Sequence, residues 1–399
     1  MAWPVAEHVM TVEAAMSIRL GRQCLHVPSA RLGLYLALRH WLSPGDRLLL
    51  SPTNCETVLF VILAAGLNPV MAPISTRDGN IDLAKVDWAG LSGVLTTHLY
   101  GQPDQVAELE EACRSRGVTL IDDAAHALGI DVAGRPLGTF GDVGVLSLAK
   151  HARAMSGGFL TSADTAKLAE AKVTRDALLQ PGAWQDQILG VLRPMAREAI
   201  TKARLVRPVW QAMTSLGITR WTGHRLAIRE QELRSALRVA GTDEDAGLTS
   251  LNRWLSIDLT KWRMRQAGLL RHYQMTRLRA ADRERERRIT GVRVLRATPW
   301  AAEGVREAEA LPLLRVPLLV RRRDDVVRAL ERRGVVPGFI YDPPLNDYLT
   351  GMRPAPTPAH ARWWTRHVLP VDPLRAHRMV RLLTELGTTP ASVPDDLGN

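Results

Sequence analysis

The feature that most constrains the fold of this chain is a regular alternation of helical segments and short apolar runs between residues 29 and 164. Residues 30–42 (ARLGLYLALRHWL) predict an amphipathic helix, and the turn residues at 43–46 (SPGD) end it before an apolar strand at 47–50. Two further helices are expected at 56–65 and 105–116, and five further strands at 69–73, 94–100, 118–124, 143–149 and 158–162. Because helices and strands alternate, we expect an α/β fold whose mostly parallel sheet carries helices on both faces.

The length of the chain predicts more than one domain, since 399 residues exceed a single ordinary core. We expect a large α/β domain over residues 1–245 with a strongly basic helical insertion at about 180–240. The polar stretch GTDEDAG at 241–247 marks the boundary, and a smaller α+β domain follows over 246–399. In that second half, the pattern predicts a long helix to about residue 285, strands near 292–295 and 311–320, and helices at 324–333 and 374–386.

Charge and cysteine usage restrict the partners and the compartment. Lysine and arginine exceed the acidic residues by 52 to 41, a formal charge of +11, but no zinc finger, RNA-recognition signature or basic zipper is present, so we expect no nucleic-acid partner. The three scattered cysteines (Cys24, Cys55 and Cys113) fit neither a disulfide framework nor a metal site, which favours a reducing cytoplasm and no bound metal. No signal peptide and no run of about 18 apolar residues is found, so neither secretion nor a membrane span is expected.

The basic insertion allows two interpretations. Arginines and lysines are concentrated between residues 193 and 229 and are interleaved with tryptophans. The first interpretation is a set of solvated helices that cover the core. The second is a weak contact surface for an anionic membrane or an acidic carrier.

The candidate catalytic pair consists of a carboxylate and a lysine at the ends of two predicted strands. Asp122 and Asp123 end one apolar strand, and Lys150 follows another. In parallel sheets, ligands bind at the carboxyl ends of the strands. An amine that bonds an aldehyde, together with an acid that keeps a pyridine nitrogen protonated, is the pair that pyridoxal phosphate (PLP) needs. The simpler alternative is a surface acid pair and a surface lysine.

The order of motifs around this pair resembles the DegT/DnrJ/EryC1/StrS family of PLP-dependent aminotransferases, which act mainly on keto groups of nucleotide-linked sugars. The resemblance covers residues 27–164 well and 310–385 loosely. It is carried by LSPGD (42–46), HLYGQ (98–102), DDAAH (122–126), GRPLGTFGDVG (134–144), Ser147, Lys150, Gly157-Gly158 and LPVDP (369–373).

The resemblance implies the aminotransferase fold of type I, with PLP as cofactor, and assigns roles by position. Lys150 would bond the cofactor and later move the proton, and Asp123 would pair with the pyridine nitrogen. His126 would lie against the cofactor ring or its 3-oxygen. The phosphate would be held by Ser147 and by the amides of Ala30 and Arg31, at the start of a predicted helix.

Three departures from the family pattern are visible. Cys55 stands where many members place an aromatic residue against the cofactor ring, so it is expected to contact that ring only weakly. The spacing from Ser147 to Lys150 is two residues shorter than in the commonest members. The GYNYRM motif, whose asparagine normally reaches the phosphate of the partner subunit, is not found.

The expected activity is therefore transfer of an amino group from an amino-acid donor such as glutamate to a keto acceptor, a nucleotide sugar or a cyclitol in a biosynthetic pathway. The family resemblance also implies a homodimer. The alternatives are an enzyme recruited to another PLP reaction and a non-catalytic regulatory or binding protein with the same fold. The retained lysine separates the chain from the dehydratases of the family, which carry histidine at that position.

Overall fold

The structure is a computed structural model of the 399-residue chain. It describes residues 11–154, 156–185, 188–189, 191–192, 195–196, 230–240, 246–256, 261–335, 337–338, 340–349, 358–394 and 397. Most of the basic insertion therefore lies outside the described residues. Among the described residues, no helix combines the length and the apolar character that crossing a bilayer requires.

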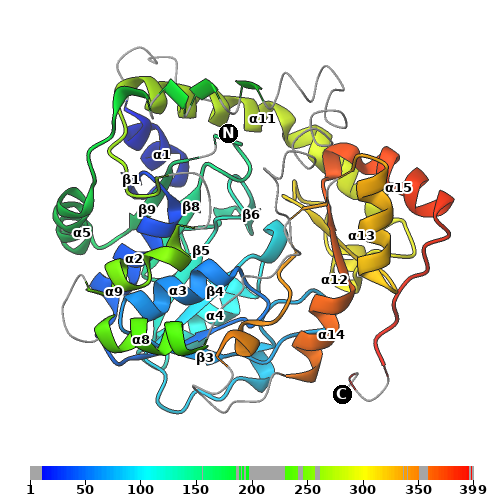
Figure 1. The fold of residues 1–399 in the computed structure, drawn as a ribbon, viewed down its shortest axis with the longest axis horizontal. Coiled ribbons are helices and arrows are strands. Elements are labelled where there is room, and N and C mark those ends of the chain that lie inside the picture. The colour runs from blue at the N-terminus through cyan, green and yellow to red at the C-terminus, as the bar shows by residue number, and fades with distance from the viewer. Residues whose placement is uncertain are drawn as a thin grey trace.

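A seven-stranded sheet forms the centre of the first half of the chain (Figure 1). In spatial order its strands are β1 (Gln23–Val27), β9 (Gly158–Ser162), β8 (Val143–Ser147), β5 (Thr119–Asp123), β4 (Gly93–Thr97), β2 (Arg47–Leu50) and β3 (Asn68–Met71). Strands β3, β2, β4, β5 and β8 are parallel, and β9 runs antiparallel to both of its neighbours. The predicted mostly parallel α/β sheet is confirmed.

Because side chains alternate in direction along each strand, apolar residues are buried on both faces of the sheet. Leu50, Leu95, Ile121, Val145 and Leu160 pack with the helices on one face. Their neighbours in sequence face the other side. The first face is covered by α2 (Ala30–Trp41), α3 (Glu56–Ala64), α5 (Thr165–Leu178), α8 (Glu230–Ala240), α9 (Ala246–Ser250) and α10 (Asn252–Leu255). The second is covered by α1 (Val12–Leu20), α4 (Val106–Arg114) and residues from the second half of the chain.

Short turns of helix and one hairpin complete this half. They are η1 (Leu83–Lys85), η2 (Leu99–Gly101), and the two-stranded sheet of β6 (Asp131–Val132) and β7 (Arg135–Pro136). The α2 helix begins at Ala30 because the Ser29 hydroxyl, next to it, accepts the Leu32 N–H at 3.2 Å.

The second half is built on the long helix α11 (Gly268–Arg296), which runs along the top of the view from α1 to α15 (Figure 1). An antiparallel pair, β10 (Val316–Leu319) and β11 (Val368–Val371), lies beneath it. Helices and turns surround this pair: α12 (Glu303–Glu307), α13 (Arg323–Arg332), η3 (Leu345–Tyr348), α14 (Ala359–His367), η4 (Pro373–Arg375) and α15 (Ala376–Glu385).

Two expectations about this half are wrong. Residues 292–295 are not a strand but the last turns of α11, where Val292 and Leu295 are buried on one side of the helix. The same helix continues eleven residues beyond the predicted end at 285. Four residues with three apolar positions fit either period, so only the packed neighbours decide between helix and strand.

The predicted domain boundary at residue 245 remains a prediction. Helices α9 and α10, which follow it, pack against α3 of the large sheet, and Trp254 stacks on Phe60 with ring centroids 5.8 Å apart.

Candidate active site

The candidate catalytic pair lies at the carboxyl ends of two neighbouring strands. Asp123 ends β5, where it is in register with Val145 of β8. Ser147 ends β8, and Lys150 follows three residues later. Because β5 and β8 are parallel neighbours, the acid and the lysine emerge at the same edge of the sheet.

Asp123 is only 5% exposed and accepts two hydrogen bonds. Its Oδ1 accepts the Ala125 N–H at 3.0 Å, and its Oδ2 accepts the Thr97 hydroxyl at 3.4 Å. Asn54, which sequence reasoning missed, donates to that Thr97 hydroxyl at 2.8 Å. Burial raises the pKa of Asp123 to about 6, because the charged form loses its hydration. A cation placed against this carboxylate would relieve that cost.

Lys150 and Cys55 influence each other electrostatically across the site. Burial lowers the pKa of the Lys150 amine, and the positive charge of Arg315 lowers it further. Burial also raises the pKa of the Cys55 thiol, at the residue that precedes α3. Both shifts favour the uncharged forms, and a neutral amine is the form that attacks a carbonyl carbon.

Asp122 has a structural role on the opposite face of β5. Its Oδ2 accepts the N–H groups of Gly138 and Phe140 at 2.7 and 3.0 Å. Its Oδ1 lies 2.8 Å from Nε2 of His98. The Asp104 N–H donates to Nδ1 of that histidine, so the ring proton is on Nε2 and points to Asp122. The first acid of the DDAAH motif thus ties the glycine-rich loop to the HLYGQ turn.

The HLYGQ turn brings an aromatic stack to the site. Tyr100, His126 and Tyr341 lie nearly parallel, with interplanar angles of 15–16° and ring centroids 5.8–6.4 Å apart. Nδ1 of His126 accepts the Tyr100 N–H at 3.2 Å, so its proton is on Nε2, which donates to the Tyr341 hydroxyl at 3.1 Å. Burial lowers the pKa of His126 well below its usual value, which keeps the ring neutral.

Tyr341 is a residue that the sequence did not point to, and its replacement offers a test of this arrangement. In Tyr341→Phe the buried Nε2–H of His126 loses its acceptor, and we expect the free energy of unfolding to fall by about 1–3 kcal/mol. Denaturant unfolding measures it. In a His126→Ala background the same change should cost much less, because the donor is gone. Equal losses in the two backgrounds would show that the hydrogen bond is not the cause.

Ser147 lies beside the start of α2. It is in register with Gly158, and a Cβ on that glycine would lie 2.4 Å from the Leu146 carbonyl oxygen and 3.0 Å from the Ala30 nitrogen. The neighbouring Gly157 has a φ of +91° and donates its N–H to the Pro28 carbonyl at 2.6 Å. The glycine pair therefore lets β9 approach the helix N-terminus closely, where the first amides are suited to bind an anion.

The Arg31 side chain is turned toward another segment. Its guanidinium donates to the Leu255 carbonyl and lies 5.8 Å from the centre of the Trp262 ring. Its positive charge still lowers the pKa of Lys150.

The residues present fit PLP, as judged by the chemistry of the donor set and the space beside it. A lysine with a lowered pKa, a buried carboxylate with a raised pKa, and a helix N-terminus beside a serine lie at one edge of the sheet. These groups suit an aldehyde carbon, a pyridine nitrogen and a phosphate. The close approach around Gly158 leaves no room for a side chain at that position.

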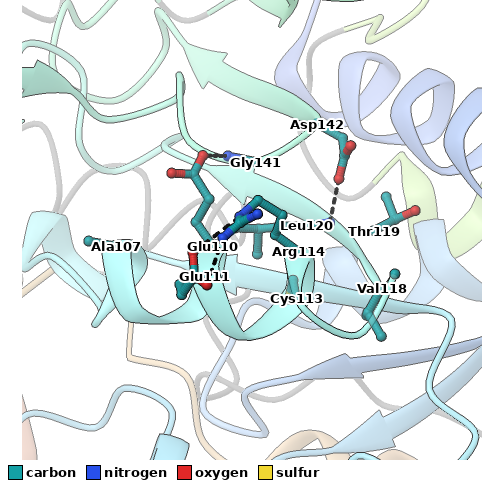
Figure 2. Close-up of a pocket in the computed structure, with 11 residues that line it drawn as sticks. Ala107, Glu110, Glu111, Cys113, Arg114, Val118, Thr119, Leu120, Gly141 and Asp142 are labelled. Carbon is teal, nitrogen blue, oxygen red and sulfur yellow. Dashed lines mark hydrogen bonds and ion pairs between the residues drawn. The ribbon is translucent and has the colours of Figure 1, made fainter.

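A pocket at the other edge of the sheet does not contain this pair. Figure 2 shows it between α4 and the start of β5, with a volume of about 500 Å³. Its charged side chains are engaged nearby: Glu110 accepts the Gly141 N–H, Arg114 pairs with Glu111, and Asp142 accepts the Leu120 N–H. Because Thr119 begins β5 and Asp123 ends it, this pocket lies at the opposite end of the strand.

Comparison with solved structures shows the fold. PseC of Helicobacter pylori, an aminotransferase involved in the biosynthesis of pseudoaminic acid, superposes on 94% of this chain and 90% of its own, with a TM-score of 0.63 at 15% identity. DesI, whose structure was determined in the presence of its TDP-sugar product, covers 94% of this chain and 84% of its own, with a TM-score of 0.60 at 21% identity. The predicted aminotransferase fold is thus confirmed.

Sequence comparison extends the likeness to characterised proteins. A dTDP-4-dehydro-2,3,6-trideoxy-D-glucose 4-aminotransferase of Saccharopolyspora spinosa is 31% identical over 144 residues, which are 34% of this chain and 37% of that protein. A GDP-perosamine synthase of Vibrio cholerae is 28% identical over 141 residues, 35% of this chain and 36% of that protein. The aligned segments thus span little more than a third of these relatives. Residues 7–191 match the sequence model of the DegT/DnrJ/EryC1/StrS aminotransferase family, so this part of the chain is similar to that family.

Proposed function

We propose that this protein is a PLP-dependent aminotransferase that moves an amino group from an amino-acid donor, glutamate in the first instance, to a keto acceptor. The proposed acceptor is a nucleotide sugar or a cyclitol in a biosynthetic pathway. The observation that carries the proposal is the placement of Asp123 and Lys150 at adjacent strand ends, with both pKa values shifted toward the neutral forms.

In this proposal the chain would hold the cofactor at three points. Lys150 would bond its aldehyde carbon, Asp123 would pair with its ring nitrogen, and Ser147 with the amides of Ala30 and Arg31 would hold its phosphate. His126 and Cys55 lie against the ring. When bound, PLP supplies an electron sink for the electrons left on the substrate carbon.

The residues of the chain then orient the reactants and move the proton. Asp123 remains ionised beside the protonated ring nitrogen, which offsets the cost of burying its carboxylate. Lys150 Nζ would take the proton from the amino-bearing carbon of the donor. The His126–Tyr341 hydrogen bond and the stack with Tyr100 fix the ring of His126 in one orientation.

The experiment that tests the function supplies the purified, PLP-loaded protein with glutamate and a panel of keto sugars and keto cyclitols. We expect 2-oxoglutarate and an aminated acceptor in equal amounts. Omission of the acceptor should limit 2-oxoglutarate to one equivalent per site. A protein that binds no PLP would overturn the proposal. One that binds PLP but transfers no amino group across the panel would point to another PLP reaction or to a non-catalytic role.

We also propose a homodimer with the active site near the shared face, because the family resemblance implies a pocket completed by two subunits. Light scattering measures the mass. We expect about twice the 44.1 kDa of one chain, and a stable active monomer would contradict the proposal.

A weak contact with an anionic membrane or an acidic carrier is proposed for the basic insertion at about 180–240. Most of it lies outside the described residues, but Trp184 and Met195 within it are 70% and 54% exposed. Binding to vesicles that contain anionic lipid should weaken as salt is raised, because screening reduces the attraction. Absence of binding at low ionic strength would leave the solvated-helix interpretation.

We retain two further proposals. One is the division into a large domain over 1–245 and a smaller one over 246–399. The other is a location in the reducing cytoplasm, which the three free cysteines favour.

A further inference from the structure

A charged cluster around Asp372 adjoins Lys150. The Asp372 carboxylate follows β11 and faces three guanidinium groups, at 3.6 Å from Arg153 Nη2, 3.6 Å from Arg288 Nη1 and 3.3 Å from Arg315 Nη1. These arginines come from the loop after β8, from α11 and from the residue before β10. The cluster therefore joins the large sheet to the second half of the chain.

The cluster carries more positive than negative charge. Besides Asp372, its other carboxylate is Glu284, which lies 3.7 Å from both Arg153 and Arg288. The three guanidinium groups and two carboxylates within ion-pair distance leave a net charge of +1, to which Arg375 adds a further positive charge near Arg315. Burial lowers the pKa of Arg288 only to about 10, so it stays protonated at neutral pH. His151 adds no charge, because burial lowers its pKa to about 3.

Some polar atoms of the cluster and of the neighbouring His151 make long contacts or have no hydrogen-bond partner among the described residues. The contacts of Asp372 with the three arginines are longer than an ordinary N–H···O hydrogen bond of about 2.7–3.2 Å. Nη2 of Arg288, only 2% exposed, has no hydrogen-bond partner among the described residues. The same holds for Nδ1 of His151, which is 5% exposed. Buried polar groups without partners are uncommon and point to a group that completes them.

Two backbone hydrogen bonds connect the cluster to the loop that carries Lys150 and to the HLYGQ turn. The Arg153 N–H donates to the Lys150 carbonyl at 3.2 Å, and the Arg315 N–H donates to the Tyr100 carbonyl at 3.0 Å. The Arg315 guanidinium is confined on its other side, since a Cβ on Gly338 would lie 2.6 Å from its Nε. The side chains of Arg153 and Arg315 are 43% and 28% exposed, so a small anion can reach them from solvent.

We propose that this cluster binds a carboxylate group of the amino-acid donor, with Arg315 and Arg153 in direct contact and Arg288 as a buried positioning residue. The planar fork of a guanidinium group matches the two oxygens of a carboxylate. That the ligand is the amino donor rests on the proposed function. The bound carboxylate shares the guanidinium groups with Asp372 and neutralises the remaining charge.

The first test measures binding of glutarate, a dicarboxylate that has no amino group and cannot react, to the PLP-loaded protein by calorimetry. In Arg315→Gln the affinity should fall by about tenfold or more, the effect of losing hydrogen bonds to a charged group. Arg315→Lys should retain part of it. The control is Arg114→Gln, at an exposed arginine that pairs with Glu111 on α4 and should bind glutarate like the wild type. Wild-type affinity in a folded Arg315→Gln protein would overturn the proposal.

The second test uses a substitution that should raise the affinity for glutarate. Asp372→Asn removes the competing carboxylate and raises the net charge of the cluster by one, while the amide oxygen can still accept the Leu374 N–H that Asp372 accepts at 3.1 Å. Glutarate should bind more tightly in this variant. If the cluster only stabilises the fold, the variant loses thermal stability without tighter binding, and that result overturns the proposal. If the variant does not fold, the two Arg315 variants decide.

Steady-state kinetics separates this inference from the proposed function. In Arg315→Gln we expect the KM for glutamate to rise by about tenfold or more, with smaller changes in kcat and in kcat/KM for the acceptor. Failure of the wild type to retain PLP or to transfer an amino group defeats the proposed function. Glutarate binding needs no turnover, so its loss or retention is measured independently.

Discussion

Lys150→Arg is expected to abolish covalent attachment of PLP and to lower amino transfer by at least about 10³-fold, the range that nucleophilic and general acid–base catalysis supply. Arginine retains a long basic side chain beside Cys55 and Asp123. Its guanidinium, however, stays protonated at any working pH and can neither bond the aldehyde carbon nor move a proton. The assay is borohydride reduction, digestion and mapping of the modified peptide by mass spectrometry, with turnover measured in parallel.

The matched control is Lys85→Arg, at a half-exposed lysine that pairs with Asp82 at 3.5 Å, far along the chain from β8. This variant should be labelled at Lys150 and turn over like the wild type. Besides Lys150 and Lys85, the sequence offers lysines only at 167, 172, 202 and 261. Labelling at any of these in the wild type would show that the cofactor lysine has been misidentified.

Asp123→Asn is expected to slow amino transfer by several orders of magnitude while PLP still attaches to Lys150. The amide keeps the shape of the carboxylate but removes the negative charge that stabilises a protonated ring nitrogen. Fixed charges of this kind are each worth a few kcal/mol in the transition state. Half-reaction rates with glutamate measure the loss. An unimpaired variant would show that another acid faces the nitrogen.

The same substitution should stabilise the protein when the cofactor is absent. Burial raises the pKa of Asp123 from 3.8 to about 6, so folding favours its protonated form. The stability that this group contributes is present below about pH 4 and is lost as the pH rises through about 6. The shift of about two units corresponds to roughly 3 kcal/mol. The unfolding free energy of Asp123→Asn should therefore exceed that of the wild type at pH 8 and approach it near pH 4.

Asp104→Asn provides the control for this pair of effects. Asp104 is also buried, its pKa is likewise raised to about 6, and its oxygens accept the Thr96 hydroxyl and the Gln105 N–H. It should show the same dependence of stability on pH without a comparable loss of amino transfer. A similar catalytic loss in both variants would mean that buried charge in general, and not its position against the cofactor, is what the reaction needs.

The large sheet could be predicted because its signals are local. Apolar runs bounded by turn residues identify β2, β5, β8 and β9 within one or two residues of their observed ends. Asp123 ends β5 and Lys150 follows β8. The two residues lie at the same edge of the sheet because β5 and β8 are parallel neighbours. The strand expected at 292–295 is wrong because the spacing of its two buried residues, Val292 and Leu295, also suits a helix, and both residues belong to α11.

The rest of the site could not be read from local patterns. Tyr341 lies 215 residues from the His126 that it contacts, and Arg315 lies in an irregular segment before β10. Nothing in their immediate sequence distinguishes them from other tyrosines and arginines. Asn54 sits within the turn before α3, and only the fold brings its amide to Thr97. The contacts of Tyr341 and Arg315 depend on how the second half of the chain packs onto the sheet.

Two contacts of Tyr100 with the second half of the chain also restrict how the molecule can move. Its carbonyl accepts the Arg315 N–H, its ring stacks on Tyr341, and a Cβ on the next residue, Gly101, would lie 2.9 Å from the Leu314 nitrogen. A rigid-body rotation of the β10–β11 pair against the seven-stranded sheet must either break these contacts or have its hinge axis pass close to them. Near such an axis displacements are smallest, so Arg315 and Tyr341 would keep their positions.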